Sequence, residues 1–152
     1  MKFFIKKTIK NYYYLFAGIL AILFSISHAW NGQSVVLPTL NVEKISINTR
    51  TIFFYVWHII TAENMLFGIA FIVMAFHKDL SKVRFTAWMI ALLMIVRLVV
   101  IVVGTWLYDA SGLENVLIDS IAIVIYVSII ILGIRVKDKK TNTQMIMNMS
   151  NN

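Results

Sequence analysis

The segment YVWHIITAENMLFG, residues 55–68, places polar side chains inside an otherwise apolar run of the chain. The polar residues are His58, Glu63 and Asn64. Ionisable side chains are costly to keep within an apolar span, so they are candidates for function. An imidazole can relay protons or sense pH, and a carboxylate can pair with a cation.

Three more ionisable side chains lie inside apolar runs, namely His28, Arg97 and Asp119. Glu63 and Arg97 each lie about twelve residues from the start of their runs, and so near the middle of a membrane. An unpaired arginine at that depth costs at least about 2.5–3.5 kcal/mol. We therefore predict that Glu63 pairs with Arg97 and stays ionised.

The remaining ionisable groups are expected nearer the outer surface. His58 and Asp119 lie about six or seven residues from the outer ends of their runs, and His28 lies close to such an end. The opposite half of each run is almost wholly aliphatic. The pattern predicts a polar binding pocket that opens to the outside, formed by His28, His58, Glu63, Arg97, Asp119 and Tyr126.

Four long apolar runs must position these side chains, and they cover residues 12–30, 51–76, 85–108 and 113–134. Each is close to the ~20 residues that a helix needs to cross a bilayer. The chain is 60% hydrophobic and only 14% charged, with a mean hydropathy of +0.81. We predict an all-α integral membrane protein with a four-helix up-down bundle over residues 12–134, in which residues 31–50 form the one long loop.

Lysine and arginine predict the orientation of these runs. Four lie in the N-terminal segment 1–11, three in the 77–84 connection and four in the tail 135–152, which makes eleven. Only Lys44 and Arg50 lie on the other side. Cytoplasmic segments carry such an excess, so both termini are expected in the cytoplasm and the tail is expected to be disordered. Frequent Ile, Lys and Asn indicate an AT-rich bacterial genome, so the expected location is the bacterial cytoplasmic (inner) membrane.

Small and polar residues indicate which face of each helix points inward, because lipid offers them no favourable contact. For the first run this face carries Tyr14, Ala17, Ala21, Ser25 and His28. For the second it is centred on Tyr55, Ile59, Ala62, Leu66 and Ala70, with Asn64 pointing away. For the third it carries Thr86, Ile90, Leu93, Arg97, Ile101, Gly104 and Tyr108. For the fourth it carries Asn115, Asp119, Ala122, Tyr126 and Gly133.

Several functions fit these residues. The preferred interpretation is binding or transport of a small polar or amphipathic molecule, or of a proton, by a homo-oligomer or a subunit of a larger membrane complex. A membrane-embedded enzyme, or a haem b protein using His28 and His58, is an alternative. A structural, accessory or immunity-type protein without chemistry is another.

Other classes of function are disfavoured. The chain has no cysteine, which excludes thiolate chemistry, and it contains neither HExxH nor GxSxG. No cofactor is therefore predicted, and an enzyme is the less favoured class. The net charge of +7 lies at the ends of apolar runs, which favours a lipid bilayer as partner over nucleic acid. Ser27 to Ala29 also resemble a signal-peptide cleavage site, which would remove the first run.

Overall fold

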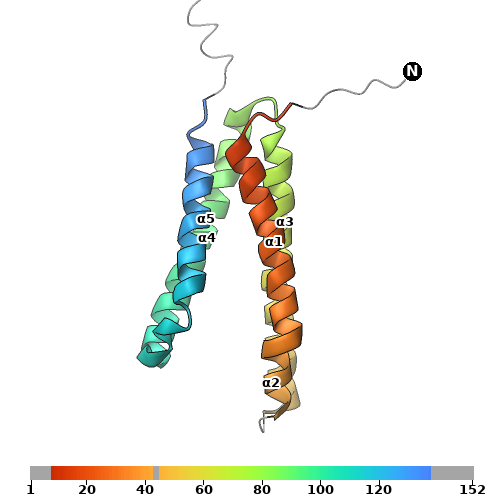
Figure 1. Cartoon of the computed structure of the whole chain (residues 1–152), viewed down its shortest axis with the longest axis vertical. Helices are drawn as coiled ribbons and strands as arrows, with labels where there is room; N and C mark the ends of the chain where they lie inside the picture. Colours follow the sequence, from red (N-terminus) through yellow and green to blue (C-terminus); the bar gives the residue numbers. More distant parts are fainter. Residues whose placement is uncertain (1–7, 43–44, 138–152) are drawn as a thin grey trace, which may run out of the picture. The chain divides into compact units, whose positions relative to one another are not determined.

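The first helical stretch of the chain is longer than its apolar run. In the computed structural model, which describes residues 8–42 and 45–137, α1 (Tyr12–Asn31) continues into a π-helix, η1 (Gly32–Val36), and then into α2 (Leu37–Val42) (Figure 1). The prediction of a loop over residues 31–50 was therefore wrong. The wider π-helical turn ends two residues before Pro38, whose ring would meet the carbonyl of Ser34 in a regular α-helix.

Three more α-helices follow. They are α3 (Ile47–Ala75), α4 (Leu80–Tyr108) and α5 (Leu117–Ile134), and a short 3₁₀ helix, η2 (Ala110–Glu114), precedes α5. All regular structure in the described part of the chain is helical, as predicted. The fourth predicted run begins at residue 113, whereas α5 begins four residues later, so Asn115 lies outside it.

Four helices in the described residues are long and apolar enough to cross a membrane: Tyr12–Leu40, Ile47–Ala75, Leu80–Tyr108 and Leu117–Ile134. Only 22–28% of their most apolar windows is buried inside the protein. Large apolar side chains such as Phe85 and Ile118 are more than 70% exposed. Such extensive apolar surface needs an apolar solvent, as expected for a multi-pass membrane protein.

The chain divides into two compact units, which are described separately. Residues 17–72 form the α1–α3 unit, which also holds η1 and α2. Residues 8–16 and 73–137 belong to the other, the α4–α5 unit. The predicted basic segment 1–11 and tail 135–152 lie partly outside the described residues, which exclude 1–7 and 138–152.

Small residues bring α1 and α3 together in the α1–α3 unit. Gly18 and Gly68 are both buried at the crossing, and the Ser25 hydroxyl donates to the carbonyl of Thr61 at 2.8 Å. The buried face of α1 confirms the predicted one, because Ala17, Ala21 and Ser25 are all at most 2% exposed.

The predicted face of α3 does not pack against α1. Tyr55, Ile59 and Leu66 are all exposed within the α1–α3 unit. Asn64, predicted to point away, is half-buried on the same side as Gly68. The prediction placed the face between two ionisable residues, whereas close helix packing is decided by the smallest ones.

Antiparallel helices α4 and α5 pack side by side in the α4–α5 unit (Figure 1). Their buried residues lie in the first half of α4 and the second half of α5, and they are Leu80, Ala87, Ile90, Ala91, Met94, Tyr126, Val127, Ile130, Gly133 and Ile134. Of the predicted face of α4, Ile90 is buried within this unit, whereas Leu93 and Tyr108 are exposed. That of α5 was correct at Tyr126 and Gly133.

Asn11 links the start of α1 to the end of α5 within the same unit. Its amide nitrogen Nδ2 donates to the carbonyl of Gly133 at 2.8 Å, and its Oδ1 accepts from the backbone N–H of Tyr14 at 3.2 Å. The backbone N–H groups of Lys10 and Asn11 both donate to the carbonyl of Ala75 at the end of α3. The side-chain amide of Asn11 thus supports two helix ends, and the backbone N–H groups of Lys10 and Asn11 support a third.

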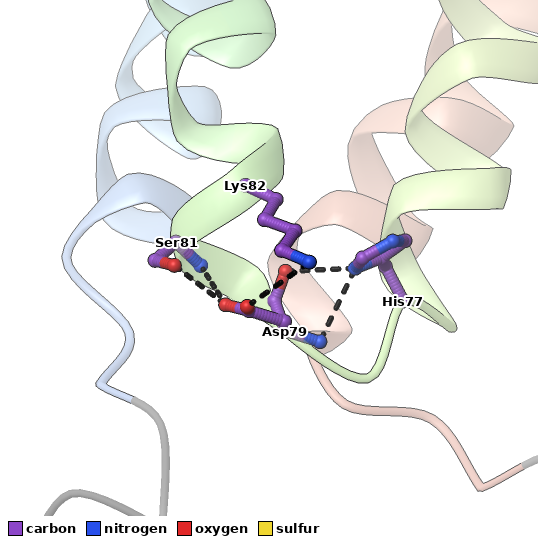
Figure 2. A network of polar contacts seen from close by, with 4 residues as sticks. All are labelled: His77, Asp79, Ser81 and Lys82. Carbon is purple, nitrogen blue, oxygen red and sulfur yellow. Dashed lines mark hydrogen bonds and ion pairs between the residues drawn. The ribbon is translucent and has the colours of Figure 1, made fainter.

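A polar network closes the turn between α3 and α4 (Figure 2). The carboxylate of Asp79 caps α4, because it accepts hydrogen bonds from the backbone N–H and the hydroxyl of Ser81. Lys82 lies 4.0 Å from the same carboxylate. The Nδ1 atom of His77 lies 2.7 Å from the carbonyl oxygen of Asp79 and 3.2 Å from its backbone nitrogen, so its protonation decides which hydrogen bond forms.

Candidate functional site

The π-helix η1 lies against the indole of Trp57 in the α1–α3 unit. A Cβ atom added to Gly32 would overlap the Trp57 ring, so only glycine fits at this approach. The indole N–H of Trp57 donates to the carbonyl of His28 at 2.9 Å. The His28 ring stacks on the same indole, with centroids 4.2 Å apart and planes 4° from parallel. Trp57 thus fixes both the backbone and the side chain at the end of α1.

His58, the next residue along α3, contacts the first turn of η1. Its Nε2 atom lies 2.9 Å from the amide nitrogen of Gln33. An amide NH₂ can only donate, so Nε2 accepts this bond and neutral His58 carries its proton on Nδ1. The ring of Phe54 packs edge-on against His58, with centroids 4.6 Å apart. The imidazole is thereby held in one orientation and one tautomer.

A cavity of about 370 Å³ lies directly beside this hydrogen bond. Residues from η1, α2 and the first turns of α3 line it, and they are Gln33, Leu37, Pro38, Leu40, Arg50, Thr51 and Phe54. Two of these residues, Gln33 and Phe54, also hold His58. The cavity and the His58 ring therefore form one site, with both polar and apolar walls.

The polar walls of the cavity differ in what they offer a ligand. Arg50 is half-buried and provides a guanidinium with five N–H donors. Gln33 has a second amide N–H besides the one directed at His58. The hydroxyl of Thr51 donates to the carbonyl of Ile47 at 3.0 Å, so it presents lone pairs rather than a proton. The polar wall of the cavity thus consists of a guanidinium, an amide and a hydroxyl.

The six residues predicted to form a pocket are divided between the two units. His28, His58 and Glu63 belong to the α1–α3 unit, where Glu63 is half-buried. The other three, Arg97, Asp119 and Tyr126, belong to the α4–α5 unit. The predicted Glu63–Arg97 pair would join residues of both units, so it stays a prediction.

Within the α4–α5 unit these three residues lie in different surroundings. Tyr126 is 2% exposed and Arg97 is half-buried. Asp119 is exposed in the first turn of α5, where the helix dipole favours a negative charge. Across residues 8–42 and 45–137, no group of three or more His, Cys, Asp or Glu side chains could hold a metal ion.

Sequence reasoning missed most of the residues around the cavity. Arg50 was interpreted only as an orientation signal, and Gln33 was placed in a loop. A usable signal was present, because Val36, Leu37 and Leu40 continue the apolar spacing of a helix past residue 31. Glycine at position 32 also indicates a close approach by another element.

Comparisons with known proteins assign no family to the chain. No protein-family model, no curated protein and no solved structure matches it. The functional argument therefore rests on the chemistry and arrangement of its own residues.

Proposed function

We propose that this small multi-pass membrane protein binds or transfers a small polar or amphipathic molecule at an outward-facing polar pocket. The observation that carries this proposal is the cavity of about 370 Å³ beside the His58–Gln33 hydrogen bond. Its volume falls within the range of ~300–1,000 Å³ typical of ligand pockets. A few polar groups among apolar walls are also typical of such sites.

The distribution of charge supports an outward-facing cavity. Arg50 lines it and belongs, with Lys44, to the side of the protein that is poor in basic residues. The eleven basic residues of the opposite side favour a cytoplasmic location for both termini. The proposal therefore includes an up-down arrangement of the four helices in a bacterial cytoplasmic membrane.

Single cysteines can test this orientation, because the chain has no cysteine of its own. Thr39→Cys and Lys82→Cys alter exposed residues at opposite ends of their helices. A membrane-impermeant maleimide should label Thr39→Cys in intact cells and Lys82→Cys only after the membrane is permeabilised. The opposite labelling pattern would contradict the orientation.

Native mass spectrometry of the detergent-extracted protein tests ligand binding. We expect a retained small molecule or lipid on the wild-type protein and its loss from Thr51→Trp, because an indole would fill the cavity. Thr86→Trp, at an exposed position on α4, is the matched control and should keep the ligand. Equal retention by both variants would place the bound molecule elsewhere and contradict the proposal.

The same spectra distinguish the alternative functions. A haem protein would retain a mass corresponding to haem, and His28→Ala or His58→Ala would remove it. A purely structural protein would carry no small molecule that depends on the cavity, while the partner protein would remain attached in mild detergent. Either result would replace the proposed function.

A further inference from the structure

We propose that the cavity recognises the oxyanion headgroup of an amphipathic molecule, a phosphate or a carboxylate, with Arg50 as the residue that binds the anion. This inference rests on the proposed function and specifies its ligand class. It follows from the placement of Arg50, Gln33 and the apolar residues around one cavity in the α1–α3 unit.

The charge of the cavity wall selects an anion. Arg50 is the one ionisable residue among the seven described residues that line the cavity. A guanidinium is always protonated and presents a planar fork of donors that matches a carboxylate or a phosphate.

Gln33 can assist Arg50 in holding the anion. One of its amide protons is directed at Nε2 of His58, and the other remains for a ligand in the cavity. The π-helix positions Gln33, and π-helical turns are frequent at functional sites. The bond to His58 fixes which way the amide points, so the donor is already oriented before a ligand arrives.

The apolar wall selects an amphipathic molecule over a free ion. Leu37, Pro38 and Leu40 come from α2 and Phe54 from α3, so aliphatic and aromatic surface faces the same space as the guanidinium. Burying a methylene group against such surface is worth about 0.8 kcal/mol. A headgroup with an attached hydrocarbon tail would satisfy both walls, whereas inorganic phosphate would leave the apolar wall unused.

Three probes separate the contributions of charge and tail. Dodecyl phosphate, dodecyltrimethylammonium and inorganic phosphate are titrated against the full-length protein in a neutral maltoside detergent, and binding is followed by native mass spectrometry. Dodecyl phosphate should bind most tightly, at one molecule per chain. Dodecanoate, with the same length of chain, shows whether the site prefers a phosphate or a carboxylate.

Substitution of Arg50 gives the decisive comparison. Arg50→Gln should weaken dodecyl phosphate binding by about tenfold or more, because it removes charge-assisted hydrogen bonds. Arg50→Lys keeps the charge without the fork and should bind with intermediate affinity. Arg135→Gln, at an exposed position just after α5, is the matched control and should bind like the wild type. Helical content measured by circular dichroism confirms that each variant is folded.

Each contrary result has a separate meaning. Equal binding of the anionic and cationic probes, unchanged in Arg50→Gln, would overturn this inference and leave the proposed function standing. Inorganic phosphate binding as tightly as dodecyl phosphate would overturn the amphipathic part of the inference. Binding of none of the probes, together with no retained molecule on the extracted wild-type protein, would overturn both.

Discussion

Gly18 and Gly68 lie against each other's backbone where α1 crosses α3. A Cβ atom at Gly18 would lie 2.9 Å from the carbonyl oxygen of Gly68, and one at Gly68 would lie 2.9 Å from that of Gly18. Atoms this close must move apart, and backbone atoms of two packed helices cannot move independently. The absence of side chains at these two positions therefore sets the distance between the helices.

Gly68→Ala should destabilise the α1–α3 unit. The added methyl group would also meet Cγ1 of Ile22 at 2.6 Å, and overpacking of this kind costs about 1–3 kcal/mol. We expect a lower midpoint of thermal unfolding in detergent, followed by circular dichroism. Gly104→Ala is the matched control, because a Cβ there has nothing within 4 Å, and it should leave the midpoint unchanged or raise it. Equal midpoints for Gly68→Ala and the wild type would show that the crossing is looser than described.

Asn11→Ala should destabilise the α4–α5 unit by about 1–3 kcal/mol. The substitution leaves the buried carbonyl of Gly133 without the donor from Asn11 and removes the acceptor for the N–H of Tyr14. Asn11→Asp separates the two effects, because a carboxylate keeps the acceptor and loses the donor. Asn115→Ala, at an exposed site before α5, is the control. Chemical unfolding in mixed micelles gives the free energies, and an unchanged value for Asn11→Ala would contradict the role of this amide.

Neutral His58 should carry its proton on Nδ1. Its Nε2 atom faces the amide nitrogen of Gln33 at 2.9 Å and must accept the hydrogen bond. Nitrogen-15 chemical shifts of the labelled imidazole distinguish the two tautomers. Gln33→Leu should remove this preference, whereas Asn115→Leu, at an exposed site before α5, should leave it unchanged. Detection of the Nε2–H tautomer in the wild type would show that the amide presents its oxygen to the ring.

Ser81→Ala should raise the pKa of the Asp79 carboxyl towards its usual value. The hydrogen bond from the Ser81 hydroxyl is the main cause that holds this pKa below 3.8, and Lys82 adds a smaller effect. A lowered pKa stabilises the folded state above the unfolded value of 3.8, and this stabilisation is lost as the pH falls through the folded value. Carbon-13 titration of the carboxyl measures the change.

Asp109, whose pKa is lowered in the same way by Ser111, provides an internal control for that titration. Its pKa should not move in Ser81→Ala. A Ser81→Ala protein in which Asp79 titrates as in the wild type would show that the hydroxyl contributes nothing.

The helices themselves could be predicted from sequence because a bilayer imposes a strong constraint. The predicted start at residue 12 and ends at residues 108 and 134 agree with α1, α4 and α5. The starts of α3 and α4 lie four and five residues before their predicted positions, at Ile47 and Leu80. Polar residues can extend a helix beyond its apolar run. The start of α4 is set by its N-cap residue Asp79, and a hydropathy pattern does not reveal such a cap.

The faces and the cavity were harder to predict. α1 carries its small residues on one stripe, so its buried face could be identified. In α3 the prediction was centred between the ionisable residues His58 and Glu63, whereas the contact with α1 is made at Gly68. The cavity depends on η1, and no sequence rule places a π-helical turn at Gly32. The relation of Glu63 to Arg97 depends on the arrangement of the two units, which local patterns do not determine.

The length of the helices around the cavity has a consequence for the membrane that can host the protein. The helix Tyr12–Leu40 and α3 have 29 residues each, or about 43 Å at 1.5 Å per residue. The hydrocarbon core of a bilayer is only ~30 Å thick, so both helices must tilt strongly or project beyond it. The cavity is lined by the last turns of one and the first turns of the other, at the ends that would project if the helices do not tilt. A thicker bilayer would submerge this entrance and a thinner one would leave it in water, so lipid chain length becomes a means of controlling its occupancy.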